Sequence, residues 1–253
     1  MTSTAIDTVE LRKFTRGFDW NDWPEPTCPA CGKGRLVLEE KHLRMEKGGN
    51  AKSQELMARP EGSPFDISGV FHAELHCNRK NCGDWVAVTG DYFVDQTYDT
   101  TGDWEWGDCV RVRTMYPAID ILTIPKATPD KVATNLRRAA ALVWMDPSSA
   151  VSALRTALER LMDEQGIKKM RNLHRRIESY RDTRNEKFGK LLLAVKYVGN
   201  SGTHTDDPIT STDAIDMAEF IEIVIISLYE PADDHSSALV RADRIIAAGK
   251  LVD

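Results

Sequence analysis

The chain has 253 residues, of which 42% are hydrophobic and 28% are charged, and its formal net charge is −6. This length is enough for one large domain or for two smaller ones, each with its own core. The negative charge argues against a protein covered in basic residues, but it leaves room for a local basic surface. Neither a basic and apolar leader nor an apolar stretch of membrane-spanning length is visible in the sequence. We therefore expect a soluble, cytoplasmic protein with no membrane partner.

Four of the five cysteines form two pairs, and each pair is followed directly by glycine. The first pair is Cys28-Pro-Ala-Cys31-Gly, and in the second Cys77 and Cys82 are separated by four residues. In such a knuckle the chain turns tightly, and glycine allows the positive φ that points amide N–H groups at the sulfurs. Two knuckles supply four thiolates, the closed tetrahedral set of a structural Zn²⁺ site. The sequence thus predicts a zinc ion that stabilises the fold and does no chemistry.

This use of cysteine suits a reducing compartment, where metal binding is expected rather than disulfide formation. His76 lies next to Cys77 and is an alternative ligand in place of one thiolate. Cys109 is left over, and no His or Lys stands beside it in sequence to lower its pKa. We expect Cys109 to be a half-buried thiol without a reactive role.

Up to about residue 125, short runs alternate apolar and polar residues between Gly, Pro and Asp turns. This pattern predicts paired strands at residues 35–38, 70–75, 85–88 and 110–114, with residues 116–121 extending the last strand along a sheet edge. Residues 46–69 are rich in glycine and proline and are expected to form a long loop. The tryptophans of residues 18–23 and 103–106 alternate with acids, so we expect them to pack around the strands rather than stack on bases.

Beyond residue 125 the apolar residues recur with a helical period. The expected helices cover residues 128–143, 146–166, 173–180, 188–199, a long segment from 210 onward, and 236–248. Thr128 and Asp146, each followed by proline, are expected N-caps, and Gly166 and Gly199 are expected to end helices. The stretch Phe220–Ile226 is apolar on nearly all sides, which is typical of a helix at the centre of a bundle. These patterns together predict an α+β chain, with a β-rich zinc ribbon in residues 1–122 and an α-helical domain in residues 123–253.

The order of the motifs resembles a known family. After the cysteine pairs these motifs are Tyr116-Pro117-Ala118-Ile119-Asp120, residues 146–150 leading into 154–161, residues 173–177, and Gly199-Asn200-Ser201-Gly202-Thr203-His204. Over roughly residues 115–232 the chain is similar to the prokaryotic domain of unknown function numbered 4145, whose members often carry an N-terminal zinc module. That family is grouped with the HEPN (higher eukaryote and prokaryote nucleotide-binding) domains. The resemblance implies a HEPN-like helical bundle and a setting in antiphage defence.

Many HEPN domains are metal-independent ribonucleases with an Arg-x4-6-His arrangement, and the resemblance identifies His204 as the histidine. In such a site the imidazole moves a proton and the guanidinium stabilises the charge that develops on the phosphate. Here Gly199 stands where the arginine is expected, and the nearest upstream cation, Lys196, lacks the planar fork of arginine. We therefore predict a non-catalytic binding or adaptor protein. The alternative is a ribonuclease that uses His204 with Asn200 and Lys196.

A basic stripe makes nucleic acid one expected partner. Eight residues belong to it: Lys168, Lys169, Arg171, His174, Arg175, Arg176, Arg181 and Arg184. A stripe of this density can make several phosphate contacts, and we expect Arg171, Arg175 and Arg176 to make them. Interspersed acids leave open the alternative of a solvated helix face with ion pairs.

Two further partners are expected. HEPN-like domains commonly pair, and the apolar stretch Phe220–Ile226 calls for cover, so we expect a homodimer. The family resemblance also implies a protein partner in a defence system.

Overall fold

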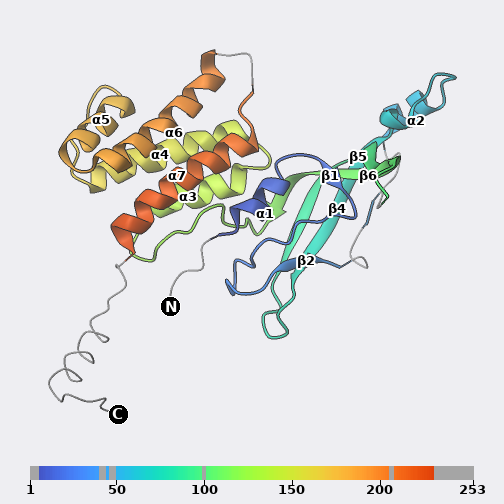
Figure 1. The fold of residues 1–253 in the computed structure, drawn as a ribbon, viewed down its shortest axis with the longest axis horizontal. Helices are drawn as coiled ribbons and strands as arrows, with labels where there is room; N and C mark the ends of the chain where they lie inside the picture. Colours follow the sequence, from blue (N-terminus) through green and yellow to red (C-terminus); the bar gives the residue numbers. More distant parts are fainter. Residues whose placement is uncertain (1–5, 40–43, 46–49, 99–100, 205–207, 231–253) are drawn as a thin grey trace, which may run out of the picture.

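The computed structural model of the chain describes residues 6–39, 44–45, 50–98, 101–204 and 208–230, and for residues 44–45 and 196–204 it describes the backbone alone. The N-terminal half forms a curled antiparallel sheet and the C-terminal half forms a group of packed helices beside it (Figure 1). The predicted α+β class is therefore confirmed. No helix in these ranges is both long and apolar enough to cross a membrane.

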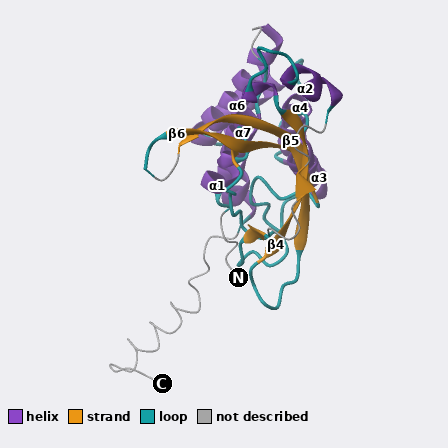
Figure 2. Cartoon of the chain, turned by 90° about the vertical axis from the view of Figure 1, so that its right-hand side faces the viewer, coloured by secondary structure: helices purple, strands orange, loops and turns teal. Residues whose placement is uncertain are grey.

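The sheet is antiparallel throughout, in the order β1-β6-β5-β4-β2, with β3 also paired to β4. Its strands are β1 Phe18–Asp19, β2 Leu36–Leu38, β3 Arg44–Met45, β4 Ser68–Cys77, β5 Trp85–Tyr98 and β6 Trp104–Tyr116. The ladder between β5 and β6 has an irregularity between Thr89 and Gly90. A Cβ at Gly90 would overlap the carbonyl oxygen of Arg111, so only glycine fits this point of the sheet. Figure 2 shows the long strands curving rather than lying flat.

The four predicted strands are present, and three of them, β4, β5 and β6, are longer than the pattern indicated. Strand β5 continues to Tyr98 because its polar end pairs residue by residue with β6. The predicted extension through residues 116–121 is wrong, since β6 ends at Tyr116. Pro117 follows and has no N–H to donate to a ladder.

Residues 46–69 are not one long loop, and this expectation is corrected over its described part. They contain helix α2 Ala51–Met57 and a short 3₁₀ helix, η2 Pro64–Asp66. The Asn50 side chain accepts a hydrogen bond from the Ser53 amide, which caps α2. Ser63 and Asp66 form a capping box around η2. These local caps outweigh the surrounding Gly and Pro residues.

The remaining helices are α1 Thr8–Lys13, α3 Asp130–Leu142, α4 Pro147–Glu164, α5 Leu173–Thr183, α6 Glu186–His204 and α7 Ser211–Tyr229. The expected starts at Asp146 and Thr210 are confirmed, because each side chain accepts an amide hydrogen bond from the first turn. Gly166 has φ +68° and follows α4 as predicted. The N-cap of α3 is Pro129 rather than Thr128.

Helix α6 runs past Gly199 to His204, so the expected end at Gly199 is wrong. A glycine costs only about 1 kcal/mol inside a helix, which does not by itself end one. The helix expected at residues 236–248 lies outside the described residues. The sequence analysis did not foresee α1.

Helix α1 connects the two parts of the molecule. Its N-cap Asp7 accepts a hydrogen bond from Arg35, next to the first knuckle, at 2.8 Å. On the same helix, Arg12 forms ion pairs with Asp216 and Glu219 of α7. Buried residues of the sheet and of the helices belong to one continuous hydrophobic cluster. The boundary between residues 1–122 and 123–253 stays a prediction.

Candidate functional site

The first knuckle is a tight turn held by its own backbone. The Gly32 amide donates to the Cys28 carbonyl at 2.9 Å, and the Cys28 amide donates to the Gly34 carbonyl at 2.8 Å. Gly32 has φ +59°, as its place after Cys31 predicted. The Gly34 amide donates to Cys31 Sγ at 3.3 Å. This amide-to-sulfur bond favours the thiolate form of Cys31.

The second knuckle closes the turn between β4 and β5. The Cys82 amide donates to the Arg79 carbonyl at 3.0 Å, and the Cys77 amide donates to the Asp84 carbonyl at 2.9 Å. Gly83, directly after Cys82, has φ +70°. Both knuckles therefore use the glycine conformation that the sequence predicted.

The two knuckles are bound to each other by backbone and side-chain contacts. The Arg35 amide donates to Asn78 Oδ1 at 3.0 Å, and the Asn78 amide donates to the Arg35 carbonyl at 2.9 Å. A Cβ built on Gly34 would lie 2.5 Å from Cys77 Sγ, so the first knuckle leaves room there only for glycine. These contacts fix how the sulfurs face one another.

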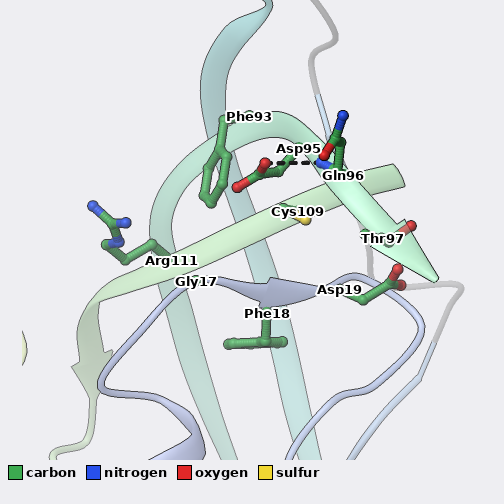
Figure 3. A pocket seen from close by; sticks show the side chains of 9 residues that line it. All are labelled: Gly17, Phe18, Asp19, Phe93, Asp95, Gln96, Thr97, Cys109 and Arg111. Carbon is green, nitrogen blue, oxygen red and sulfur yellow. Dashed lines mark hydrogen bonds between the residues drawn. The ribbon is translucent and has the colours of Figure 1, made fainter. Parts of the chain in front are cut away.

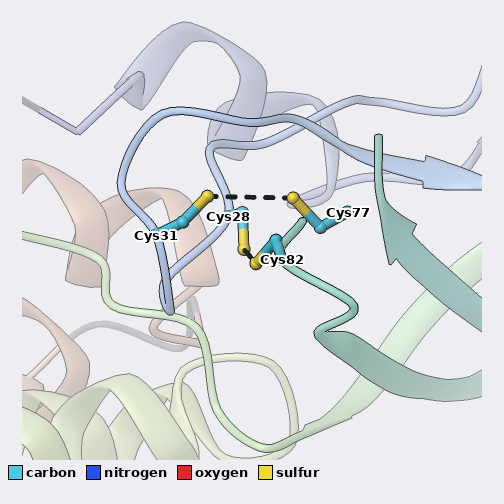
Figure 4. A group of neighbouring side chains, drawn as sticks. All are labelled: Cys28, Cys31, Cys77 and Cys82. Atoms are coloured by element: carbon cyan, nitrogen blue, oxygen red, sulfur yellow. Dashed lines mark hydrogen bonds between the residues drawn. The ribbon is translucent and has the colours of Figure 1, made fainter. Parts of the chain in front are cut away.

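The four cysteines of the two knuckles form one cluster (Figure 4). Sγ of Cys28 and Cys82 lie 3.8 Å apart, as do Sγ of Cys31 and Cys77. All four sulfurs lie within 4.8 Å of one another. A tetrahedral ion with metal–sulfur bonds of about 2.3 Å separates its sulfurs by about 3.8 Å. The geometry is that of a group that could hold one metal ion.

Histidine does not join the cluster within the described residues. His76 lies 3.2 Å from Glu74 and stacks on Trp85, with ring centroids 6.3 Å apart. The alternative in which His76 replaces a thiolate is therefore not supported. The predicted ligands Cys28, Cys31, Cys77 and Cys82 are brought together as a set.

The thiols differ in their surroundings. Burial raises the pKa of Cys28 to about 12. The amides of Lys33 and Gly34 lower the pKa of Cys31 to about 6 by hydrogen bonding to its sulfur. A metal ion at the centre would favour the thiolate at all four positions. Because four sulfurs fill a tetrahedral shell, such an ion has no open position for water or substrate.

The residues of the alternative ribonuclease site are Lys196, Asn200 and His204. Their backbone belongs to α6, but their side chains lie outside the described residues. Whether they form a site stays a prediction.

The predicted basic residues separate into two groups. Arg171 and Arg175 are exposed at the start of α5, with Lys168 and Lys169 exposed in the preceding loop. Arg176, by contrast, is only 6% exposed. Its guanidinium donates to Asp163 at 2.7 Å and to the Ile167 carbonyl at 2.9 Å.

The expectation that Arg176 contacts phosphate is therefore corrected. Helix α5 turns this residue inward, where its charge is balanced by Asp163 inside the helical part. The Arg176 hydrogen bond in turn holds the pKa of Asp163 below its usual range. Phosphate contacts by Arg171 and Arg175 stay a prediction.

The apolar stretch Phe220–Ile226 is largely covered within one chain. Ile221, Val224 and Ile225 are fully buried, and Ile223 is 43% exposed. A central helix in a single bundle thus accounts for the pattern. The expected homodimer stays a prediction, without support from this stretch.

The two groups of tryptophans behave differently. Trp23 packs edge-on against Phe18, Trp20 and Phe71, with centroids 5.2 to 5.8 Å apart. This part of the packing expectation is confirmed. The second group is exposed, so the same expectation is wrong for Trp104 and Trp106.

Comparison with family models gives two matches. Residues 137–245 match the domain of unknown function DUF4145, and residues 16–111 match the domain of unknown function DUF8608. Comparisons with curated proteins and with solved structures gave no match. The first match confirms the resemblance stated from the helical motifs. The second match spans both knuckles, β1 to β5 and the first part of β6.

Proposed function

We propose that the protein is a non-catalytic binding or adaptor protein, built from a zinc ribbon and a HEPN-like helical bundle. The match of residues 137–245 to the DUF4145 family supports this proposal. The observation that carries this proposal is the group of four thiols from two knuckles. A site of this kind stabilises a fold and leaves contact with partners to the surrounding surface.

Zinc is the metal that fits these ligands best. Four sulfurs at tetrahedral spacing form a soft donor set, which suits Zn²⁺ and does not suit Mg²⁺ or Ca²⁺. The ion would cross-link residues near β2 to the β4–β5 turn, and α1 ties the same region to α7. Loss of the ion would thus loosen both the ribbon and its contact with the helices.

Metal content tests this part of the proposal. We expect freshly purified protein to contain about one equivalent of zinc by elemental analysis, and Cys77→Ser to lose most of it. Cys109→Ser is the matched control, because Cys109 is a cysteine of the same sheet that lies outside the cluster. Less than half an equivalent of zinc, or a different metal in stoichiometric amount, would overturn the zinc assignment.

Nucleic acid is the partner that the charge of the helical part favours. Four exposed cations stand close together in sequence: Lys168, Lys169, Arg171 and Arg175. Within the described residues, Arg171 and Arg175 have no acidic partner, so their charges are open to a phosphate. Binding of this kind weakens steeply with salt.

Retention of labelled single-stranded RNA and DNA tests this surface. Replacing Arg171 and Arg175 together by Ala should weaken binding and reduce the slope of log affinity against log salt by about two. Arg137→Ala combined with Arg138→Ala is the control, because both arginines are exposed on α3. Equal loss in the two variants would indicate a non-specific effect of charge, and no loss in either would exclude this surface.

The defence setting rests on the family resemblance alone. Co-purification from a prokaryotic host before and after phage infection would test it. The ribonuclease alternative predicts robust RNA cleavage that His204→Ala abolishes. The binding proposal predicts that the unchanged chain and the His204→Ala variant degrade RNA to the same extent.

A further inference from the structure

Four exposed aromatic side chains gather at the far end of the β5–β6 hairpin, three from the hairpin and one from η2, and we name them the hairpin aromatic cluster. Tyr98 is 79% exposed, Trp104 60%, Phe65 55% and Trp106 40%. The rings of Trp104 and Trp106 meet edge-on at 5.9 Å, and Phe65 meets Trp106 at 4.6 Å. Tyr98 is directly opposite Trp104 in the ladder, so both lie on one face of the hairpin.

This cluster is remote from the packed core. The hairpin end and α2 lie on the side of the sheet away from the helices (Figure 1). Scattered exposed apolar residues are normal, but several large rings in mutual contact at the surface usually mark a binding site. Tyr and Trp are also the residues most often found at the centre of protein interfaces.

The described residues of this end of the hairpin carry charge of one sign. Between Phe93 and Val110 they include four acids and no Lys or Arg; the acids are Asp95, Asp103, Glu105 and Asp108. Asp95 and Glu105 are exposed and form no ion pair within the described residues. A phosphate backbone or an anionic lipid would be repelled here, whereas a cationic group would be attracted.

A pocket of about 280 Å³ opens on the neighbouring stretch of the same hairpin, where β1 pairs with β6. Asp19, Asp95 and Arg111 line it, together with Cys109, Gln96 and Thr97 (Figure 3). The pKa of Cys109 is raised to about 11, first by burial and then by the nearby carboxylates of Asp19, Asp95 and Asp108. The pocket thus offers two carboxylates beside one guanidinium and is large enough for one long side chain.

We propose that the end of the β5–β6 hairpin is a docking surface for a cationic segment of a protein partner, rich in arginine. Guanidinium groups would stack on Trp104, Trp106 and Tyr98, and the flanking carboxylates would neutralise their charge. Arginine is favoured over lysine because its planar group both stacks on rings and bonds to carboxylates. The proposal is independent of the zinc and nucleic-acid proposals, since it uses none of their residues.

A synthetic nona-arginine peptide is the probe, with nona-lysine and nona-glutamate as comparison peptides. Binding to the full chain is measured by fluorescence anisotropy of the labelled peptide. We expect nona-arginine to bind more tightly than nona-lysine and nona-glutamate not to bind. Replacing Trp104 and Trp106 together by Ala should weaken nona-arginine about tenfold, since each exposed ring contributes a few-fold to cation binding. Asp95→Asn combined with Glu105→Gln should weaken binding and flatten its salt dependence.

Trp85→Ala is the matched control, because Trp85 is an exposed tryptophan at the opposite end of β5. It should bind nona-arginine as the unchanged chain does. Equal weakening in the control and in the double tryptophan variant would overturn the proposal. So would binding of a single-stranded RNA that depends on Trp104 and Trp106, which would indicate base stacking. If light scattering shows that the unchanged chain is a dimer and that the double tryptophan variant is a monomer, the surface would instead be assigned to a second copy of the chain.

Discussion

The two ends of the sheet differ in how their polar and aromatic side chains are used, although both include strand β5. At the knuckle end, the cysteines face one another, Asn78 and Arg35 exchange hydrogen bonds, and α1 links the region to α7. At the hairpin end, Trp104 is exposed and Glu105 is without an ion pair within the described residues. At the knuckle end the polar groups bond to one another and stabilise the fold. At the hairpin end the aromatic rings and carboxylates are exposed to solvent. If the hairpin end is a docking surface as proposed, stability and partner contact are separated along one strand.

Removing the metal should have the largest effect and should act on the knuckle end. Binding of a structural zinc contributes on the order of 10 kcal/mol to the folded state of small zinc domains. With a chelator, we expect amides of residues 28–38 and 75–86 to lose protection in hydrogen exchange before those of α3 and α4. Uniform protection with and without chelator would remove the distinction between the two ends.

Removing the buried arginine of the Arg176–Asp163 ion pair should have a further large effect. Arg176→Met leaves Asp163 with only the longer contact to Arg160 and leaves the Ile167 carbonyl without this donor, so it should lower the free energy of unfolding by about 2 kcal/mol. Arg175→Met, at the exposed neighbouring position, should change it by less than about 0.5 kcal/mol. Urea unfolding of both variants measures the difference, and equal effects would contradict the inward position of Arg176.

The same pair gives a pH dependence with a defined sign. The pKa of Asp163 is lowered in the folded protein, chiefly by the hydrogen bond from Arg176. Its stabilisation is therefore present above the unfolded pKa of about 4 and is lost as pH falls through the folded value. The difference in stability between the unchanged chain and Arg176→Met should be largest near neutral pH and should shrink below about pH 4. A difference that grows on acidification would be the contrary result.

Gly90→Ala tests the middle of the sheet, between its two ends. The added Cβ would meet the Arg111 carbonyl oxygen, so the strands must shift, and we expect a loss of about 2 to 3 kcal/mol. Thr89→Ala is the control, because Thr89 is exposed in the same ladder. Thermal unfolding with zinc present measures both. A Gly90→Ala variant as stable as the control would show that the curvature at this point is not required.

The smallest effect on stability is expected at the hairpin end. Trp104→Ala combined with Trp106→Ala should change the free energy of unfolding by less than about 1 kcal/mol, because both rings are exposed. Chemical unfolding, compared with a Trp23→Ala variant that loses three ring contacts, is the measurement. If the double variant is the less stable of the two, the exposed rings have a structural role and the contrast between the ends fails.

Features set by nearby residues could be predicted from the sequence. The knuckles depend on the spacing of two cysteines and on a glycine after them, and the positive φ of Gly32 and Gly83 follows from that local pattern. The helix starts at Asp146 and Thr210 depend on one side chain and an amide three residues later. Asn50 and Ser63 are caps of the same local kind for α2 and η2, but the glycines and prolines around them favour a loop when only composition is considered.

Features that depend on which face of an element meets the core were decided only by the tertiary structure. Arg175 and Arg176 are neighbours of equal charge, yet the orientation of α5 against α4 buries one of them. Trp23 and Trp106 both stand next to acids in sequence. Trp23 packs against the buried Phe71, whereas Trp106 remains 40% exposed. The length of β5 depends on pairing with β6, since its polar end forms a strand only when another strand supplies the hydrogen bonds. The sequence determines which charged and aromatic side chains the protein has. Which of them are buried and which can contact a partner depends on the packing of the whole chain.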